Sequence, residues 1–289
     1  MNPNSLLMHG WAGPLLLALV GLIVGSFLNV VIYRLPLMLD REWRRQAREQ
    51  LGAQDRAEPA EEDTPQLNLF LPGSHCPACG YGIRAVENIP IVSWLALRGL
   101  CSNCGTAISP RYPVVEAVTA CAVLACVAAF GWAWPAIAAA GFSCVLIALA
   151  GIDFDTRLLP DQLTLPLLWA GLLANAFGGF TDLTSAVLGA AAAYLFLWAV
   201  YWIFKWLTGK EGMGYGDFKL FAAIGAWLGW TALPAVILAA AAIGLAFALV
   251  SILYKRRTRQ EPLPFGPFLA IAGWFALMFR ESGMSALPL

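Results

Sequence analysis

Long apolar runs separated by short polar stretches fill most of the chain. A helix needs about 20 mostly apolar residues to cross the roughly 30 Å of hydrocarbon in a bilayer. Eight runs approach this length, although the fourth and sixth are short, at about 14–33, 113–132, 135–152, 162–177, 184–204, 218–231, 233–254 and 265–280. The pattern predicts an all-α polytopic membrane protein with about eight transmembrane helices.

Composition supports this class of protein. Hydrophobic residues make up 60% of the 289 positions and charged residues only 12%, whereas soluble domains carry about 25% charge. The mean hydropathy is +0.69. No positive charge precedes the first run and no small-residue cleavage site follows it, so we expect a retained helix and not a signal peptide. A formal net charge of zero argues against a nucleic-acid partner.

The basic residues predict the orientation in the membrane. Nine of the 18 Lys and Arg residues lie in 34–112. Eight spans threaded with this segment in the cytoplasm leave only Arg280 outside, which is a 17-to-1 split in agreement with the positive-inside rule. The other basic residues on the inner side are Arg157, Lys205, Lys210, Lys219, Lys255, Arg256, Arg257 and Arg259.

This topology divides the chain into three parts. Residues 1–33 hold the first transmembrane helix, 34–112 form a cytoplasmic segment, and 113–289 form a domain of seven transmembrane helices. Within the cytoplasmic segment, 37–66 is charged, begins with a helix-like composition and ends as a loop.

The cytoplasmic segment carries four regularly spaced cysteines. Cys76, Cys79, Cys101 and Cys104 form two C-x2-C pairs with 21 residues between them, and Gly80 and Gly105 follow the pairs. Two such pairs can hold Zn²⁺ tetrahedrally, and four thiolates leave no open position for catalysis, so we expect a structural metal. Two disulfides or reduced thiols are the alternative, but disulfides are rare in the cytoplasm.

One histidine lies beside the cysteine motif, and three further cysteines lie outside it. His75 adjoins Cys76 and could compete as a ligand, although four cysteines suffice. Three other cysteines lie in apolar runs and are expected to pack as small hydrophobic residues, namely Cys121, Cys126 and Cys144.

Two short stretches with aspartate residues lie at the ends of predicted transmembrane runs. Asp153 directly follows an apolar run in IDFDTRLLPD, and Asp217 lies in GMGYGDFKL just before another. The predicted topology brings both to the cytoplasmic face, where a pair of carboxyls can share one proton and activate water, as in aspartyl proteolysis. Gly214 and Gly216 permit close approach of another chain. Read alone, the GxGD motif favours a helix-capping role for Asp217 over a catalytic one, and Asp161 is predicted to N-cap the fourth helix.

Other functions fit the residues less well. With only two histidines, His9 and His75, the chain offers no base for a Ser-His or Cys-His pair and no H-E-x-x-H motif. A proton-coupled transporter is an alternative, yet transport sites lie near the midplane of the membrane. A non-enzymatic assembly factor, docking a secretion ATPase or a pilin through its zinc segment, is another.

Several motifs together resemble the bifunctional type IV prepilin peptidases, which are GxGD-type aspartyl proteases and N-methyltransferases of pilus and type II secretion systems. The resemblance covers nearly the whole chain. Besides the two cysteine pairs, the matching motifs are GSFLNVVIYRLP at 25–36, ENIPIVSWL at 87–95, IDFDTRLLPD at 152–161 and GMGYGDFK at 212–219.

The resemblance implies a bacterial inner-membrane enzyme that cuts the basic leader from prepilins and pseudopilins at the cytoplasmic face. It then methylates the new N-terminal residue with S-adenosylmethionine. The catalytic aspartates would be Asp153 and Asp217, and the metal ligands the four cysteines. The family often has a basic residue just before the third cysteine, where this chain has Leu100. No methyl-transfer role is therefore assigned to this position. Contact with the pilus or secretion machinery is also expected.

The sequence does not locate the methyl-donor site by any motif, because no glycine-rich nucleotide motif follows a strand. Asn29, Glu87 and Asn88 are the candidates. Asn29 lies one turn from Gly25 and Ser26, where helix packing is the alternative role. For Glu87 and Asn88 the alternative is a solvated loop, and Trp94 is read as an interfacial anchor.

Overall fold

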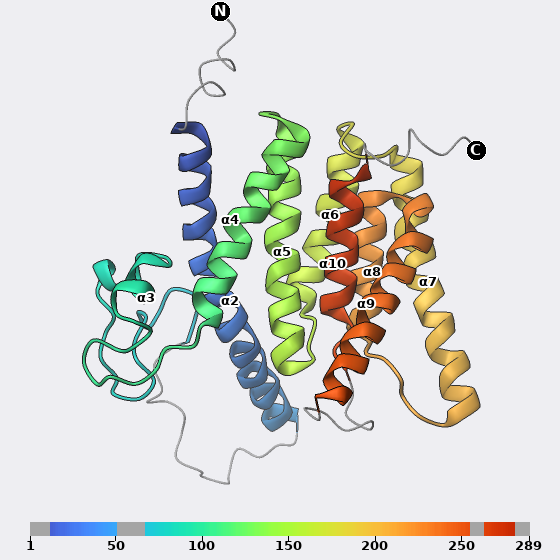
Figure 1. The fold of residues 1–289 in the computed structure, drawn as a ribbon. Coiled ribbons are helices and arrows are strands. Elements are labelled where there is room, and N and C mark those ends of the chain that lie inside the picture. Colours follow the sequence, from blue (N-terminus) through green and yellow to red (C-terminus); the bar gives the residue numbers. More distant parts are fainter. Residues whose placement is uncertain (1–11, 51–66, 255–262, 281–289) are drawn as a thin grey trace, which may run out of the picture. The chain divides into compact units, whose positions relative to one another are not determined.

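The computed structural model describes residues 12–50, 67–254 and 263–280, and the regular structure in these ranges is helical apart from two isolated β-bridges (Figure 1). The chain divides into two compact units, Met1–Cys121 and Ala122–Leu289, which are described separately. The longer helices are α2 (Ala12–Gln50), α4 (Arg111–Phe130), α5 (Trp134–Thr156), α6 (Asp161–Ala176), α7 (Leu183–Thr208), α8 (Tyr215–Leu228), α9 (Leu233–Leu253) and α10 (Gly266–Met278). Three short helices accompany them, η2 (Ala85–Asn88), α3 (Val92–Ala96) and η3 (Trp230–Ala232).

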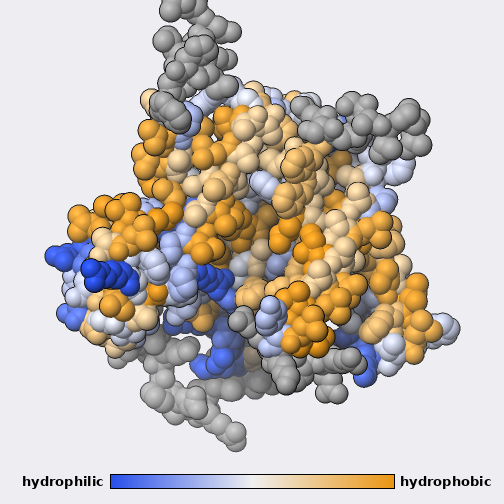
Figure 2. Space-filling model, in the orientation of Figure 1, coloured by the Kyte–Doolittle hydropathy of each residue, from blue (hydrophilic) through white to orange (hydrophobic). Residues whose placement is uncertain are grey.

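Each of the eight predicted apolar runs overlaps one of the longer helices. Five segments are long and apolar enough to cross a membrane: α2, α4, α5, α7 and Trp230–Leu253, which includes α9. Helix α10 is a shorter apolar helix, while α6 and α8 have only 16 and 14 residues. The protein is therefore an all-helical, multi-pass membrane protein, and apolar residues cover much of the surface in Figure 2.

Helix α2 continues without a break from the apolar run into the charged stretch. It has 39 residues and contains Pro36, so the predicted domain boundary after residue 33 falls inside one helix. The helix-like start predicted for 37–66 is confirmed up to Gln50. The rest of that stretch, His9 and the basic residues at 255–259 lie outside the described residues.

In the first unit, α2 and α4 contact each other through small residues. A Cβ atom on Gly21 would lie 2.6 Å from Cα of Ala120, and one on Gly25 would lie 2.6 Å from Cα of Glu116. The close approach of the two helices therefore depends on these glycines, as small residues at membrane helix contacts generally allow.

In the second unit, α8 is the central helix. Eleven of its 14 residues are buried, and α6, α7 and α10 pack around it. Gly225 of α8 meets Gly189 of α7, where a Cβ on either residue would lie 2.4–2.5 Å from the carbonyl oxygen of the other.

The far end of α8 is held by side-chain hydrogen bonds to α6. Asn175 donates to the carbonyl oxygens of Ala226 and Trp227, and Trp227 donates its indole N–H to Leu167 at 2.8 Å. The two bonds from Asn175 satisfy carbonyl groups at the end of α8 that would otherwise lack a partner. They also fix α8 relative to α6.

Candidate active site and metal centre

Asp153 lies in the last turn of α5. The helix ends at Thr156, and Arg157 adopts the left-handed conformation as its C-cap. The Asp153 side chain is buried, with 5% of the residue exposed, and its Oδ2 accepts a hydrogen bond of 2.9 Å from the backbone N–H of Gly266. The start of α10 thus fixes the orientation of this carboxyl group.

Asp217 lies in the first turn of α8, and Gly214 occupies the N-cap position. Only 8% of Asp217 is exposed. Its Oδ1 is fully buried and has no hydrogen-bond partner among the described residues. Buried carboxyl oxygens are normally paired, so this oxygen is a candidate position for a bound water molecule or substrate group.

Leu159 lies beside both aspartates. A Cβ on Gly216, which precedes Asp217, would lie 2.7 Å from Cβ of Leu159, and one on Gly266 would lie 2.7 Å from Oδ2 of Asp153 and 3.3 Å from Leu159. The two carboxyl groups are close enough to interact electrostatically. The structure therefore brings together the two acids that the sequence paired, and glycines stand at the close contacts with Leu159 and with Asp153.

The other acids of this region are more accessible. Asp155 is exposed, two residues from the buried Asp153. Asp161 was predicted to N-cap α6, which is wrong, because Pro160 holds that position and no side chain caps the helix. Asp161 instead begins the helix and binds Nζ of Lys219 with both carboxylate oxygens at 2.7 Å. The ion pair joins the first residue of α6 to the second turn of α8.

The four cysteines of the first unit converge. Their sulfur atoms all lie within 4.8 Å of one another, and Sγ of Cys76 is 3.8 Å from Sγ of Cys104. Four thiolates at Zn–S bonds of about 2.3 Å lie about 3.8 Å apart in a tetrahedron. The donor set and its spacing therefore fit a Zn²⁺ ion.

The two cysteine pairs have the same local geometry. Gly80 and Gly105 have φ angles of +69° and +71°. Their N–H groups donate to the carbonyl oxygens of Cys76 and Cys101 at 2.9 and 3.0 Å. Glycine reaches this left-handed conformation without strain. His75 lies outside the cluster, with Nδ1 3.0 Å from the carbonyl oxygen of Gly73.

The cysteines outside this cluster differ in exposure. Cys126 is buried against Ser143, Cys144 is partly buried and Cys121 is exposed. The packing role predicted for these three residues therefore holds for Cys126, while the Cys121 side chain points away from the folded interior.

The three methyl-transfer candidates have different surroundings. Asn29 is buried and donates to the carbonyl oxygens of Tyr112 and Gly25 at 3.1 and 3.3 Å. Glu87 in η2 accepts hydrogen bonds from the side chain and the backbone N–H of Arg84. These bonds, together with a hydrogen bond to Ser102, lower the pKa of Glu87 to about 2. Asn88, the last residue of η2, is exposed.

Glu116 is a buried acid that the sequence analysis did not single out. It is buried in α4, and its Oε2 accepts the backbone N–H of Ile91 at 2.7 Å. Ile91 has a φ of +59°, which is unusual for a β-branched residue. The signal was present in the sequence, because an acid within an apolar run is a functional candidate by default.

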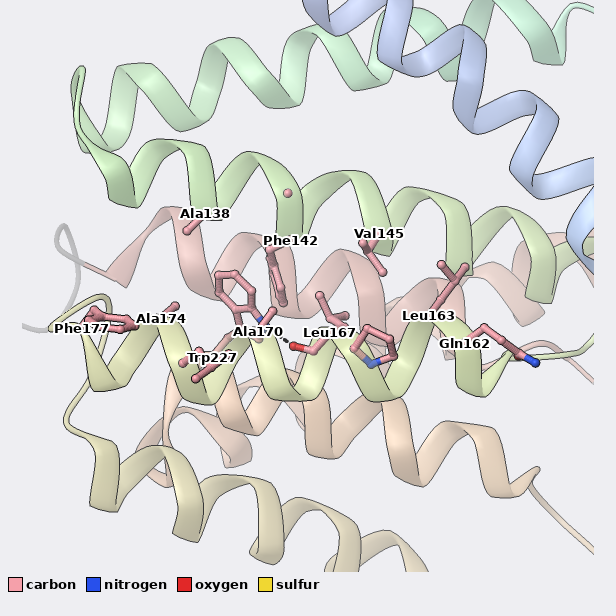
Figure 3. Close-up of a pocket in the computed structure, with 13 residues that line it drawn as sticks. Ala138, Phe142, Val145, Gln162, Leu163, Leu167, Ala170, Ala174, Phe177 and Trp227 are labelled. Atoms are coloured by element: carbon pink, nitrogen blue, oxygen red, sulfur yellow. Dashed lines mark hydrogen bonds between the residues drawn. The ribbon is translucent and has the colours of Figure 1, made fainter. Parts of the chain in front are cut away.

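A groove of about 530 Å³ lies along α6 in the second unit (Figure 3). Its lining comes mainly from α5 and α6, with Trp227 of α8 at its floor. Gln162 is the one polar side chain of the lining apart from the indole N–H of Trp227, which is bonded to Leu167. A groove of this composition offers no ligands for the charged groups of a methyl donor.

Comparison with known proteins gives matches over both units. Residues 19–130 match the bacterial peptidase A24 N-terminal domain, and residues 140–249 match the type IV leader peptidase family. No solved structure matches the chain.

Three relatives are named prepilin leader peptidase/N-methyltransferase. The Aeromonas hydrophila protein is 52% identical over 96% of this chain and 94% of its own length. The Stutzerimonas stutzeri protein is 52% identical over 97% of this chain and 96% of its own. The Pseudomonas aeruginosa protein is 50% identical over 96% and 94%. The chain belongs to the family of type IV prepilin leader peptidases/N-methyltransferases.

Proposed function

We propose that the chain removes the leader peptide from type IV prepilins and pseudopilins, with Asp153 and Asp217 as the catalytic pair. The observation that carries this proposal is the convergence of two buried carboxyl groups from α5 and α8, one of which has an oxygen without a partner within 12–50, 67–254 and 263–280. The names of the relatives supply the class of substrate.

The chemistry follows from the different surroundings of the two acids. Gly266 holds Oδ2 of Asp153, while Oδ1 of Asp217 is free to bind the attacking water. One carboxylate takes a proton from this water molecule while the oxygen of the water attacks the peptide carbonyl carbon. The other carboxyl group stays protonated and donates a hydrogen bond to the carbonyl oxygen. The carbon–nitrogen bond then breaks, and the carboxyl group that took the proton from water passes it to the leaving amine.

The second activity would be methylation of the new N-terminal amine, with S-adenosylmethionine as the methyl donor when bound. Asn29, Glu87 and Asn88 remain the candidate residues, and we add Glu116. All four lie in the first unit, which supports a methyl-transfer role for 34–112 and the helices that flank it.

The proposed metal ligands are Cys76, Cys79, Cys101 and Cys104. Four thiolates complete the tetrahedral shell of a Zn²⁺ ion, so its role would be to hold the two cysteine turns together. The chemistry of both reactions then rests on other residues.

We further propose that all eight helices cross the bacterial inner membrane, with 34–112 and both aspartates on the cytoplasmic side. The distribution of Lys and Arg residues supports this orientation. The first helix, the cytoplasmic segment and the seven-helix domain (113–289) would then have separate roles. The partners would be the bilayer, prepilin substrates and the pilus or secretion machinery, with no nucleic acid.

One assay tests both activities. Purified protein in detergent is incubated with a prepilin peptide and S-adenosylmethionine, and mass spectrometry follows the released leader and the methylated product. A leader that stays attached, with the protein folded and its metal bound, would contradict the proposal.

A further inference from the structure

Four exposed apolar side chains recur at every third position in the cysteine-bearing segment of the first unit. Val86, Ile89, Val92 and Leu95 are 67%, 47%, 59% and 62% exposed, and we call these four residues the apolar ridge. In Figure 2, apolar atoms gather on the edge of this segment that carries its short helices in Figure 1, and strongly hydrophilic residues lie below. Apolar surface of this kind marks an interaction site.

Internal contacts keep the ridge pointing outward. Trp94, between two ridge residues, packs inward against Gly99 and donates its indole N–H to the carbonyl oxygen of Ile108 at 3.2 Å. Ser93 donates to the carbonyl oxygen of Ile89 at 2.7 Å. Neighbouring side chains thus serve the fold of the segment, while the four ridge residues are left for another partner.

The same segment is attached to α2 and α4 inside their apolar runs. The backbone N–H of Ile91 binds Glu116, five residues beyond the start of α4. Phe70 stacks on Phe27 of α2, with ring centroids 6.2 Å apart. Both Glu116 and Phe27 lie in stretches of the chain predicted to be in the bilayer, so the ridge is held near the level of the membrane.

We propose that the apolar ridge inserts into the membrane, at the boundary between headgroups and acyl chains of the leaflet on its own side. The lipid-facing surface of the helices continues to this level, because Val114 and Val118 of α4 are also exposed. Exposed Arg98 follows the ridge and suits the phosphate groups of lipids, while Arg84 on its other side is paired with Glu87. Interfacial segments of this kind bury their apolar face about 5–10 Å deep.

Insertion has a direct consequence for two methyl-transfer candidates. Glu87 and Asn88 lie between Val86 and Ile89 of the ridge. An inserted ridge holds these two polar residues at the membrane surface, where a membrane-bound substrate would present a new amino terminus. The proposal itself depends only on the ridge and its attachment to α2 and α4.

The test uses the full-length protein in liposomes that contain a phospholipid with a photoactivatable diazirine in its acyl chain. After irradiation, peptide mass spectrometry maps the labelled residues. We expect label on the peptide that contains residues 86–95 as well as on the spans. Unlabelled 86–95 beside labelled spans would overturn the proposal, and protection of the ridge by a bound protein in place of lipid would do the same.

Matched variants then identify the residues responsible. Val92→Asp with Leu95→Asp should abolish the label on this peptide and leave that on α4 unchanged, whereas Val92→Leu should keep both. Metal content reports whether the segment is folded in each variant. Label that persists at 86–95 in the folded double-aspartate protein would contradict a role for the ridge.

Discussion

The backbone N–H of Gly266 donates a hydrogen bond to Oδ2 of Asp153, which lies 113 positions earlier in the chain. The bond joins the start of α10 to the last turn of α5. It makes the two aspartates unequal, because Asp153 is fixed by a backbone donor while one buried oxygen of Asp217 has no partner in the described part of the chain. This inequality suits two carboxyl groups that must play different parts in one reaction.

Replacement of either aspartate should stop peptidase activity. Asp153→Asn or Asp217→Asn keeps the size of the side chain but removes an acid–base group, and such groups contribute about 10²–10⁴-fold to rates. Leader release from a prepilin peptide measures the loss, and thermal unfolding shows whether the fold is kept. Asp155→Asn is the matched control, since Asp155 is exposed. Processing at the parental rate by Asp217→Asn would refute the pair.

The glycine beside Asp217 should be equally sensitive. A methyl group at Gly216 would lie 2.7 Å from Cβ of Leu159, so Gly216→Ala must push α8 away from Leu159. A displacement of about 1 Å in a catalytic group can cost roughly 10²-fold in rate. The kcat for leader cleavage checks this loss.

Gly214→Ala is the control for this substitution. Its Cβ would have only Asp217 Oδ2 within 4 Å, at 3.7 Å, and its φ of −82° suits alanine. We expect nearly full activity. Equal losses at positions 214 and 216 would show that general flexibility of the segment matters, and not the contact with Leu159.

The sequence predicted the helices better than it predicted their polar contacts. Apolar runs give membrane helices directly, since each span must satisfy its own backbone hydrogen bonds. The continuation of α2 through Pro36 was harder to foresee, because proline usually interrupts a helix. The Asp161 prediction failed since its partner, Lys219, lies 58 positions away and local capping rules do not include such a contact.

Parts of the candidate site that follow from local sequence patterns were predictable, whereas contacts between distant segments were not. Asp153 and Asp217 are found at the edges of apolar runs, and the cysteines by their spacing, so both patterns are local. The orphan oxygen of Asp217 and the bond from Glu116 to Ile91 depend on packing between distant segments. The methyl-donor site has no local motif at all.

Loss of one cysteine should release the metal. Cys76→Ser or Cys104→Ser removes a thiolate, and zinc binding contributes roughly 10 kcal/mol or more to folding in small zinc peptides at neutral pH. We expect lower zinc content by elemental analysis and faster proteolysis within 67–110. Cys121→Ser, on the exposed face of α4, should change neither. Unchanged zinc in Cys104→Ser would remove that residue from the proposed ligands.

The two activities should be separable. The Asp153→Asn protein should still methylate a pre-cleaved pilin with S-adenosylmethionine, because the methyl-transfer candidates lie in the other unit. Conversely, Glu87→Gln weakens the pairing with Arg84 and should lower methylation while leader cleavage continues. Incorporation of labelled methyl groups measures the first activity. Loss of methylation in a folded Asp153→Asn protein would indicate one shared site.

The ion pair between Asp161 and Lys219 should matter only modestly. Both side chains are partly exposed, and such pairs contribute about 0–1 kcal/mol. Lys219→Met should therefore lower the thermal stability slightly and leave the metal content unchanged. The double variant Asp161→Lys with Lys219→Asp should recover part of the loss. A collapse of the fold in the single variant would show a larger structural role.

The contact between Gly189 and Gly225 limits how this sequence can evolve. A methyl group on either residue meets the backbone of the other helix at 2.4–2.5 Å. Most crowded positions can be relieved by a smaller neighbour, but glycine has no smaller replacement. Neither member of the pair can therefore be compensated by a change in its partner. Exposed apolar residues elsewhere on α7 are free to exchange over generations, while these two positions are closed to substitution unless the helices move apart.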